Sequence, residues 1–202
     1  MSVQIIIDST ADLPDRLRGA FPTVPLTVRF GEEEFVDGVT IDRQTFYERL
    51  VESDVLPTTS QATPADFLPF YENVKRAGDS AVVLTIASAL SGTYQSACLA
   101  AQDYDNIYVV DSQTAAIGTG ILAEYALLCA RQGMDAPSLT ARLEEKRQDV
   151  CLIALLDTLE YLKRGGRISK AAAMAGSLLN IKPVATVQDG EVLVVGKARG
   201  SR

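Results

Sequence analysis

Short apolar runs, bounded by polar residues or by glycine and proline, recur along the chain. Such runs predict buried β-strands, and they lie at residues 3–8, 80–87, 106–112 and 150–157. Residues 25–30 differ, because only the alternate positions Leu26, Val28 and Phe30 are apolar. That alternation predicts a further strand with one buried face.

Helix signals separate these strands, at residues 41–53, 63–78 and 114–133. Asp42 is the expected N-cap of the first of these helices. The second helix begins with Thr63, Pro64 and Asp66, which form a variant of the capping box, and Gly78 is placed to end it.

Strands that alternate with helices predict an α/β domain, which we assign to residues 1–152. Its core is expected to be a mostly parallel sheet with helices on both faces. In such sheets ligands bind beyond the carboxyl ends of the strands. Hydroxyls and carboxylates follow three of the strands, at residues 8–10, 88–93 and 111–112, so we expect them to share one crevice.

The pattern then changes, and residues 153–202 are assigned to the start of a second, α+β domain. Its expected elements are a short helix, a helix of small residues and a hairpin, at residues 158–169, 170–180 and 181–199. Asp189 and Gly190 form the predicted hairpin turn. These elements bury little apolar area alone. Either they pack on the first domain, or the second domain is incomplete and the chain continued in some longer form.

Composition excludes several classes of enzyme. The chain has 202 residues, 47% of them apolar, and no histidine. The usual catalytic triads and most zinc sites need histidine, so no metal ligand and no cofactor is expected. Cys98, Cys129 and Cys151 lack metal-ligand spacing and are interpreted as buried, reduced thiols. With no basic leader and no apolar run long enough to span a bilayer, a cytoplasmic protein without integral membrane association is expected.

Charge divides the chain into an acidic body and a basic end. Residues 1–162 carry 11 Lys and Arg against 24 Asp and Glu, whereas residues 163–202 carry 8 against 2. An acidic body repels phosphates, so nucleic acid is not an expected partner. The basic end instead predicts a docking face for an acidic or phosphorylated partner.

The stretch SALSGTYQSA, residues 88–97, crowds hydroxyls onto an expected strand-to-helix turn. A nucleophilic Ser91 would need a G-x-S-x-G elbow and a base, and the sequence offers neither. As a helix cap, Ser91 would accept one backbone N–H. Capping explains Gly92 and the second hydroxyl cluster, at residues 59–61 before another helix, less well. Two hydroxyl-rich helix starts with no cation beside them predict a neutral-donor site for one carboxylate.

Several motifs occur together in an order that resembles the DegV family. They are DSTADLP (8–14), TSQATP (59–64), SALSGTYQSA (88–97), VVDS (109–112), LEYLKRGGRIS (159–169) and LLNIKPV (178–184), and the resemblance covers essentially the whole chain. It implies two α/β-type domains that enclose a long-chain fatty acid. It also implies the fatty-acid-binding subunit of a bacterial fatty acid kinase. Such a subunit presents the acyl carboxylate to a separate kinase subunit, which makes an acyl phosphate for phospholipid synthesis.

The resemblance also assigns roles to residues. In the family the threonine of T-S-Q and the serine of L-S-G-T hold the carboxylate, so the expected ligand contacts are Thr59, Ser60, Ser91, Gly92 and Thr93. The basic G-G-R-I and K-x-R segments are where the kinase docks. The expected partner contacts are therefore Arg164, Arg167, Lys197 and Arg199, with an ordinary solvated surface as the alternative. No catalytic residue is assigned.

Two alternatives to the carrier function stay open. One is a small α/β acyl hydrolase or transferase that uses Ser91, against which the absent histidine and G-x-S-x-G pattern argue. The other is a truncated family member with only an interaction role. It arises because family members continue through a further helix-and-strand region where this sequence ends, at KARGSR.

Overall fold

The computed structural model describes residues 2–53, 55–168 and 181–199. Its centre is a four-stranded sheet in the order β2-β1-β6-β7, in which every pairing is parallel. The strands are β1 (Val3–Asp8), β2 (Thr23–Val24), β6 (Ser80–Thr85) and β7 (Ile107–Asp111). This sheet confirms the predicted α/β class.

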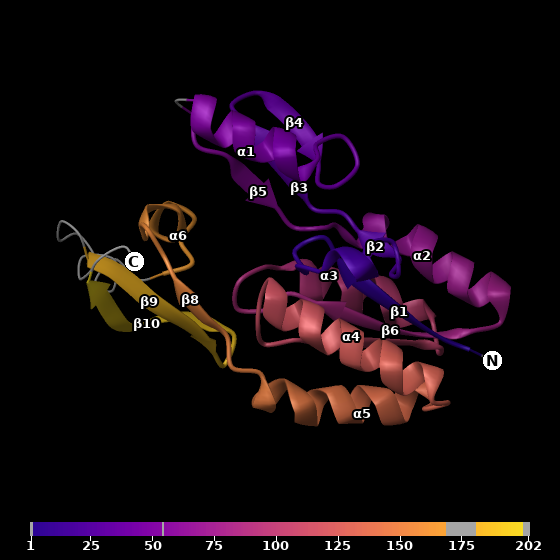
Figure 1. Cartoon of the computed structure of the whole chain (residues 1–202). Helices are drawn as coiled ribbons and strands as arrows, with labels where there is room; N and C mark the ends of the chain where they lie inside the picture. Colours follow the sequence, from indigo (N-terminus) through magenta and orange to yellow (C-terminus); the bar gives the residue numbers. More distant parts are fainter. Residues whose placement is uncertain (1, 54, 169–180, 200–202) are drawn as a thin grey trace.

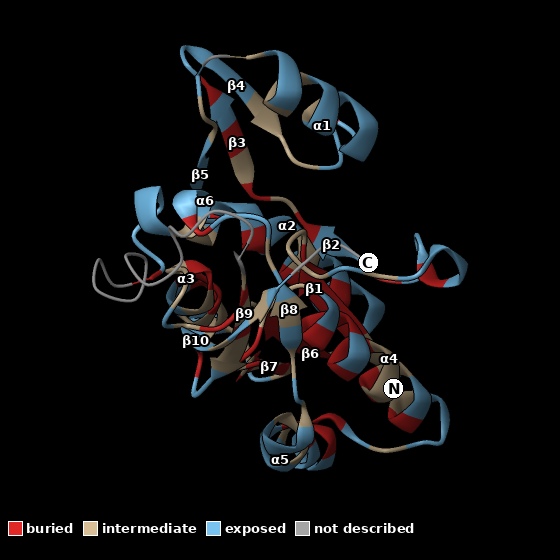
Figure 2. Ribbon diagram, turned by 60° about the vertical axis from the view of Figure 1, so that its left-hand side comes forward, coloured by how far each residue is buried: buried red, intermediate tan, exposed pale blue. Residues whose placement is uncertain are grey.

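Helices cover both faces of the parallel sheet (Figure 1). α2 (Pro64–Ala77) and α3 (Thr93–Ala100) pack on one face, and α4 (Ile117–Arg131) and α5 (Ala136–Lys146) pack on the other. Successive strand residues face opposite sides, so Ile5 and Ile7 pack towards α4 and α5 whereas Ile6 packs towards α2 and α3. Figure 2 shows buried residues concentrated in this part of the molecule.

A second sheet, antiparallel and in the order β4-β3-β5, stands apart from the parallel one (Figure 1). Its strands and the helix beside them are β3 (Thr27–Phe30), β4 (Glu33–Val36), β5 (Thr58–Ser60) and α1 (Arg43–Glu52), together called the appended unit below. The buried core of this unit is small and consists of Val28, Phe30 and Ile41. The strand predicted at 25–30 therefore corresponds to β3. It does not join the parallel sheet, whose edge is the unpredicted β2.

The third sheet has the order β10-β9-β8 and is antiparallel. It contains β8 (Ile153–Leu155), β9 (Ile181–Gln188) and β10 (Glu191–Arg199), and the short α6 (Glu160–Arg164) follows β8. Asp189 and Gly190 both have positive φ, 51° and 82°, as a two-residue type I′ turn requires, so the predicted hairpin is confirmed. The helix predicted at 170–180 lies outside the described residues. The division of the chain at residue 152 stays a prediction.

Helix ends largely follow the predicted caps. The Asp42 carboxylate accepts a hydrogen bond from the Thr45 backbone N–H at 2.8 Å, and Thr63 with Asp66 forms the capping box of α2. Gly78 ends α2 with φ at 69°, in the left-handed region that favours glycine. Short 3-10 turns lie at Asp15–Leu17, Ala101–Asp103 and Arg147–Asp149.

Two expectations need correction. The sequence signals predict no helix between residues 134 and 149, yet this stretch contains α5, which Asp135 caps by accepting from the Ser138 N–H at 2.8 Å. The three cysteines are free, but they are not all buried, because Cys98 is half-buried and Cys151 is exposed. In the described part of the chain, no helix is both long and apolar enough to cross a membrane.

Candidate ligand-binding site

The carboxyl ends of β1, β6 and β7 are tied together by two aspartates. Asp8 ends β1, and its carboxylate accepts from the Thr10 N–H at 2.9 Å and from the Ile86 N–H, just past β6, at 2.7 Å. Asp111 ends β7 and accepts from the Ser88 N–H at 3.1 Å. Because these bonds link all three strand ends, the predicted common edge is confirmed.

Asp8 is fully buried, and burial raises the pKa of its carboxyl group above the ordinary value. The hydrogen bonds from Thr10 and Ile86 favour the ionised form and oppose that shift. All of these partners belong to the turns after β1 and β6. The contacts therefore give Asp8 the role of holding two loops at the crevice.

The hydroxyl turn leads from β6 into α3. Ser91 Oγ lies 2.8 Å from Thr93 Oγ1 and accepts from the Thr93 N–H at 3.3 Å. Gly92 is the N-cap residue and α3 begins at Thr93, which is buried. The Ser91 hydroxyl therefore satisfies one N–H of the first turn, and the residue as a whole is half-buried.

The second hydroxyl cluster has a different local structure from the predicted one. Thr59 and Ser60 belong to the exposed strand β5, where Val28 of β3 is opposite Thr59, and α2 begins only at Pro64. They are therefore not at a helix start. Thr59 is nonetheless exposed, on the same face of the sheet as Val28, with which it is paired.

Gln61 joins the two clusters, although it was not among the predicted contact residues. Its Nε2 donates to Ser96 Oγ on α3 at 2.9 Å. A Cβ built on Gly92 would lie 2.0 Å from Gln61 Oε1, so the amide occupies the space that a side chain at position 92 would need. Residues 59 and 61 are separated by at most about 7 Å along an extended chain. Thr59 therefore lies in the neighbourhood of the Ser91 turn.

The third sheet reaches the same turn. Arg167 Nε donates to the Leu90 carbonyl oxygen at 3.0 Å, directly before Ser91. The hairpin turn approaches as well, because a Cβ on Gly190 would lie 3.4 Å from the Cβ atoms of Ala87 and Ala89. The turn between β6 and α3 is thus contacted from two directions, by the appended unit and by the third sheet.

A cavity of about 600 Å³ opens between this turn and β10. It is lined by Ala89, Leu90, Gly166, Arg167, Ile168 and residues 191–195 of β10. Most of the residues that line it are apolar, Arg167 and Glu191 are its charged residues, and none of the predicted ligand contacts is among them. A cavity with apolar side chains in its lining, next to a turn that carries hydroxyls, is an arrangement that suits an amphipathic anion.

The remaining predicted partner contacts lie on exposed surface. Arg164 forms an ion pair with Glu160 one turn earlier on α6. Every second residue of β10 is exposed, and Lys197 and Arg199 are among these exposed residues. Of the four predicted basic residues, Arg167 is the one whose side chain bonds directly to the hydroxyl turn.

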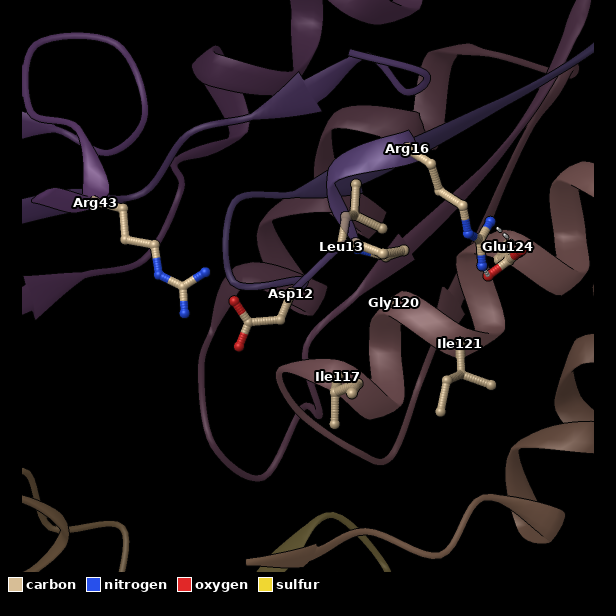
Figure 3. A pocket seen from close by; sticks show the side chains of 9 residues that line it. Asp12, Leu13, Arg16, Arg43, Ile117, Gly120, Ile121 and Glu124 are labelled. Atoms are coloured by element: carbon tan, nitrogen blue, oxygen red, sulfur yellow. Dashed lines mark hydrogen bonds and ion pairs between the residues drawn. The ribbon is translucent and has the colours of Figure 1, made fainter. Parts of the chain in front are cut away.

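A separate cavity of about 430 Å³ lies along α4 (Figure 3), away from the predicted ligand contacts. Figure 3 shows Arg16 paired with Glu124 at one end and the Arg43 side chain extending towards Asp12 at the other. The Arg16–Glu124 ion pair measures 2.6 Å. None of the predicted ligand contacts lines it. Its charges are balanced, so it offers no net attraction to a carboxylate.

The chain is thus a mixed α/β protein with hydroxyls gathered beyond the carboxyl ends of a parallel sheet. The model of the DegV family, described as a family of uncharacterised proteins, matches residues 2–202. The chain therefore belongs to the DegV family, as the motifs indicated.

Individual relatives match over nearly the whole chain. A DegV domain-containing protein of Caldanaerobacter subterraneus is 36% identical, over 99% of this chain and 72% of its own length. A structure described as fatty acid binding of a DegV family protein, from Thermus thermophilus, is 39% identical with a TM-score of 0.88, over 99% of this chain and 72% of that one. A stearic-acid-binding protein of Eubacterium ventriosum is 31% identical, also with a TM-score of 0.88, over 98% and 71%.

Proposed function

We propose that this chain binds a long-chain fatty acid, with the carboxylate at Thr59 Oγ1 and Ser91 Oγ. The observation that carries the proposal is that solved relatives of the same fold, at 39% and 31% identity, are fatty-acid-binding proteins. The hydroxyl turn beside an apolar cavity supports it from this chain's own residues.

The energetics suit such a ligand. Each methylene that leaves water contributes about 0.8 kcal/mol, so a long acyl chain in the apolar cavity supplies most of the affinity. A carboxylate is costly to desolvate unless it is hydrogen-bonded, and hydroxyl donors meet that need without a paired cation. In this proposal the hydroxyls select a carboxylate head group, and the cavity binds the acyl chain.

Two measurements test the ligand. Organic extraction of the purified protein followed by mass spectrometry is expected to release a long-chain fatty acid. Thr59→Ala combined with Ser91→Ala is expected to weaken binding by roughly 1.5–3 kcal/mol for each charge-assisted hydrogen bond lost. Thr58→Ala is the matched control, because it changes the neighbouring exposed residue of β5, whose side chain points to the other face. Equal affinities in the double variant and the control would contradict the assignment.

We further propose that the bound carboxylate is presented to a separate kinase subunit. A carboxylate oxygen would attack the γ-phosphorus of a nucleoside triphosphate held by the kinase, and the nucleoside diphosphate would leave, which yields the acyl phosphate. The basic end of the chain, which includes Arg164, Arg167, Lys197 and Arg199, suits docking of an acidic kinase surface.

Lys197 and Arg199 test docking more cleanly than Arg167, which also holds the Leu90 carbonyl. Lys197→Glu with Arg199→Glu is expected to leave fatty acid affinity unchanged. It should lower acyl phosphate formation with the cognate kinase, most strongly at low salt, because rim charges act mainly on association. Normal coupling at low salt would return both residues to ordinary solvated surface.

Catalysis is assigned to the partner in this proposal, so the isolated chain is expected to leave acyl esters intact. Ser91 Oγ bonds to Thr93 rather than to a base in the described structure. Ester hydrolysis by the isolated protein that disappears in Ser91→Ala would replace the carrier function with the hydrolase alternative.

A further inference from the structure

Two features of the first turn of α3 accommodate the Gln61 side chain: a hydrogen-bond acceptor at Ser96 and the absence of a side chain at Gly92. On one side, the Gln61 amide donates to Ser96 Oγ at 2.9 Å, and Ser96 is 4% exposed. On the other, position 92 is a glycine whose missing Cβ leaves room for Gln61 Oε1 and Cδ, which would lie 2.0 and 2.6 Å from it. Real Cβ contacts are never that short, so any side chain at position 92 would displace the amide.

This contact matters because the appended unit has little other packing against the parallel sheet. Its buried residues form a cluster of their own, separate from the two clusters on the faces of the parallel sheet. At the entry of the chain into the unit, the Leu26 N–H donates to Ser9 Oγ at 3.0 Å. At its exit, Gln61 holds the end of β5 against α3.

We propose that Gln61 is a positioning residue that fixes the distance between the Thr59 and Ser91 hydroxyls, and that Gly92 serves to admit the Gln61 amide. The inference rests on the proposed function, in which these two hydroxyls share one carboxylate. Thr59 is two residues before Gln61 on the appended unit, and Ser91 immediately precedes Gly92 on the parallel domain. Gln61 therefore spans the boundary that the two donors lie across.

This role makes Gln61 a determinant of head-group specificity. Two donors that converge on one carboxylate gain from a fixed separation, because less conformational freedom is lost when the ligand binds. A ligand with the same tail and a hydroxyl head group needs only one of them. Loss of the contact should therefore weaken fatty acid binding more than fatty alcohol binding, which a merely structural role would not do.

The test compares palmitate with hexadecanol, which have the same chain length. Gln61→Ala is expected to weaken palmitate binding by roughly three- to tenfold and hexadecanol binding by less than about twofold. Gln61→Met keeps a side chain of similar length against Gly92 and removes the donor to Ser96. An effect equal to that of Gln61→Ala would assign the role to the hydrogen bond, and wild-type affinity would assign it to packing.

A double-variant cycle tests the pairing with Gly92. Gly92→Ala is expected to weaken palmitate binding about as much as Gln61→Ala, because the new Cβ expels the same amide. The variant with both changes should then be no weaker than the worse single variant, since both changes remove one contact. Fold-losses that multiply, or equal losses for palmitate and hexadecanol, would overturn the proposal.

The outcomes separate this proposal from the one it rests on. If Thr59→Ala and Ser91→Ala weaken palmitate binding and Gln61→Ala does not, the hydroxyl site stands and the positioning role fails. If none of the three affects palmitate, the carboxylate site itself is misplaced. Thermal unfolding of each variant checks folding, and little change is expected for Gln61→Ala because the side chain is exposed.

Discussion

The parallel sheet and the appended unit differ in how much apolar surface each buries. β1 and β6 place fully buried residues on both faces, among them Ile6, Val82, Val83 and Leu84. The appended unit buries Val28, Phe30 and Ile41 on one face, and its helix α1 has no buried residue. The proposed carboxylate donors are divided between these two regions, with Ser91 on the first and Thr59 on the second.

The two regions are therefore expected to differ in local stability. Local opening costs least where few apolar contacts are lost, so the appended unit is expected to open before the parallel sheet unfolds. A ligand that bridges the two regions would restrain that opening, because it binds only when they are correctly placed.

Core truncations in the two regions should have different consequences. Leu84→Ala removes a fully buried side chain from β6 and is expected to lower the global free energy of unfolding by about 3–4 kcal/mol. Phe30→Ala is expected to raise amide hydrogen exchange in β3 and β4 while β1 and β6 stay protected. Calorimetry together with site-resolved exchange measures both. Loss of protection in β1 and β6 of Phe30→Ala would show that the appended unit is not separately stable.

The second prediction concerns Asp8, at the root of the crevice. Asp8→Asn replaces one acceptor oxygen with a donor that faces either Thr10 or Ile86, so it should lower the free energy of unfolding by roughly 1–3 kcal/mol. Urea titrations at neutral pH measure this loss. Unchanged stability would mean that the Asp8 bonds contribute no net stabilisation.

The pH dependence of the free energy of unfolding, compared between the wild-type protein and Asp8→Asn, is a separate measurement. Burial raises the pKa of Asp8 in the folded state, so the folded protein holds that proton more tightly than the unfolded chain. The stabilisation linked to this group is fully present below the ordinary carboxyl pKa and is lost as pH rises through the raised value. Asp8→Asn has no titrating carboxyl group at this position and so lacks this stabilisation. The difference in free energy of unfolding between the two proteins should therefore become smaller as pH rises from the ordinary carboxyl pKa through the raised pKa of Asp8.

The contrast between the two regions also explains what the sequence could predict. The strands of the parallel sheet are continuous apolar runs, and β1, β6 and β7 follow directly from them. β5 is Thr-Thr-Ser with every residue exposed, and β2 has two residues, so neither leaves a hydrophobic pattern to detect. α5 did leave one, because Leu139 and Leu143 are one turn apart and buried behind an Asp135 cap.

The site divides in the same way. The positions of Ser91 at a turn and of the two aspartates at strand ends could be predicted, because each position depends on the residues next to it in the sequence. The contact of Gln61 with Gly92 joins residues 31 positions apart, and the bond from Arg167 to Leu90 joins residues 77 apart. No pattern in a single sequence specifies such pairs. A glycine after a hydroxyl in a helix N-cap was a sign of close approach, but it did not identify the approaching group.

The smallest expected effect comes from a matched pair of helix caps, one in each region. Asp42 caps α1 of the appended unit and Asp135 caps α5 of the parallel domain, and each accepts from the N–H three residues later at 2.8 Å. Alanine at either position removes the same bond, so the change is chemically equal in the two regions. Asp135→Ala is expected to lower the global melting temperature by roughly 1–3 °C, whereas Asp42→Ala should change it less and instead speed amide hydrogen exchange within α1.

The hydrogen bonds of these two caps lower the pKa of both carboxyl groups. Each cap should therefore contribute its full stabilisation above the ordinary carboxyl pKa and lose it as pH falls through the lowered value. If both variants lower the melting temperature equally, the appended unit unfolds together with the parallel sheet. Thr59 and Ser91 would then be held in register by the whole fold rather than by Gln61 alone.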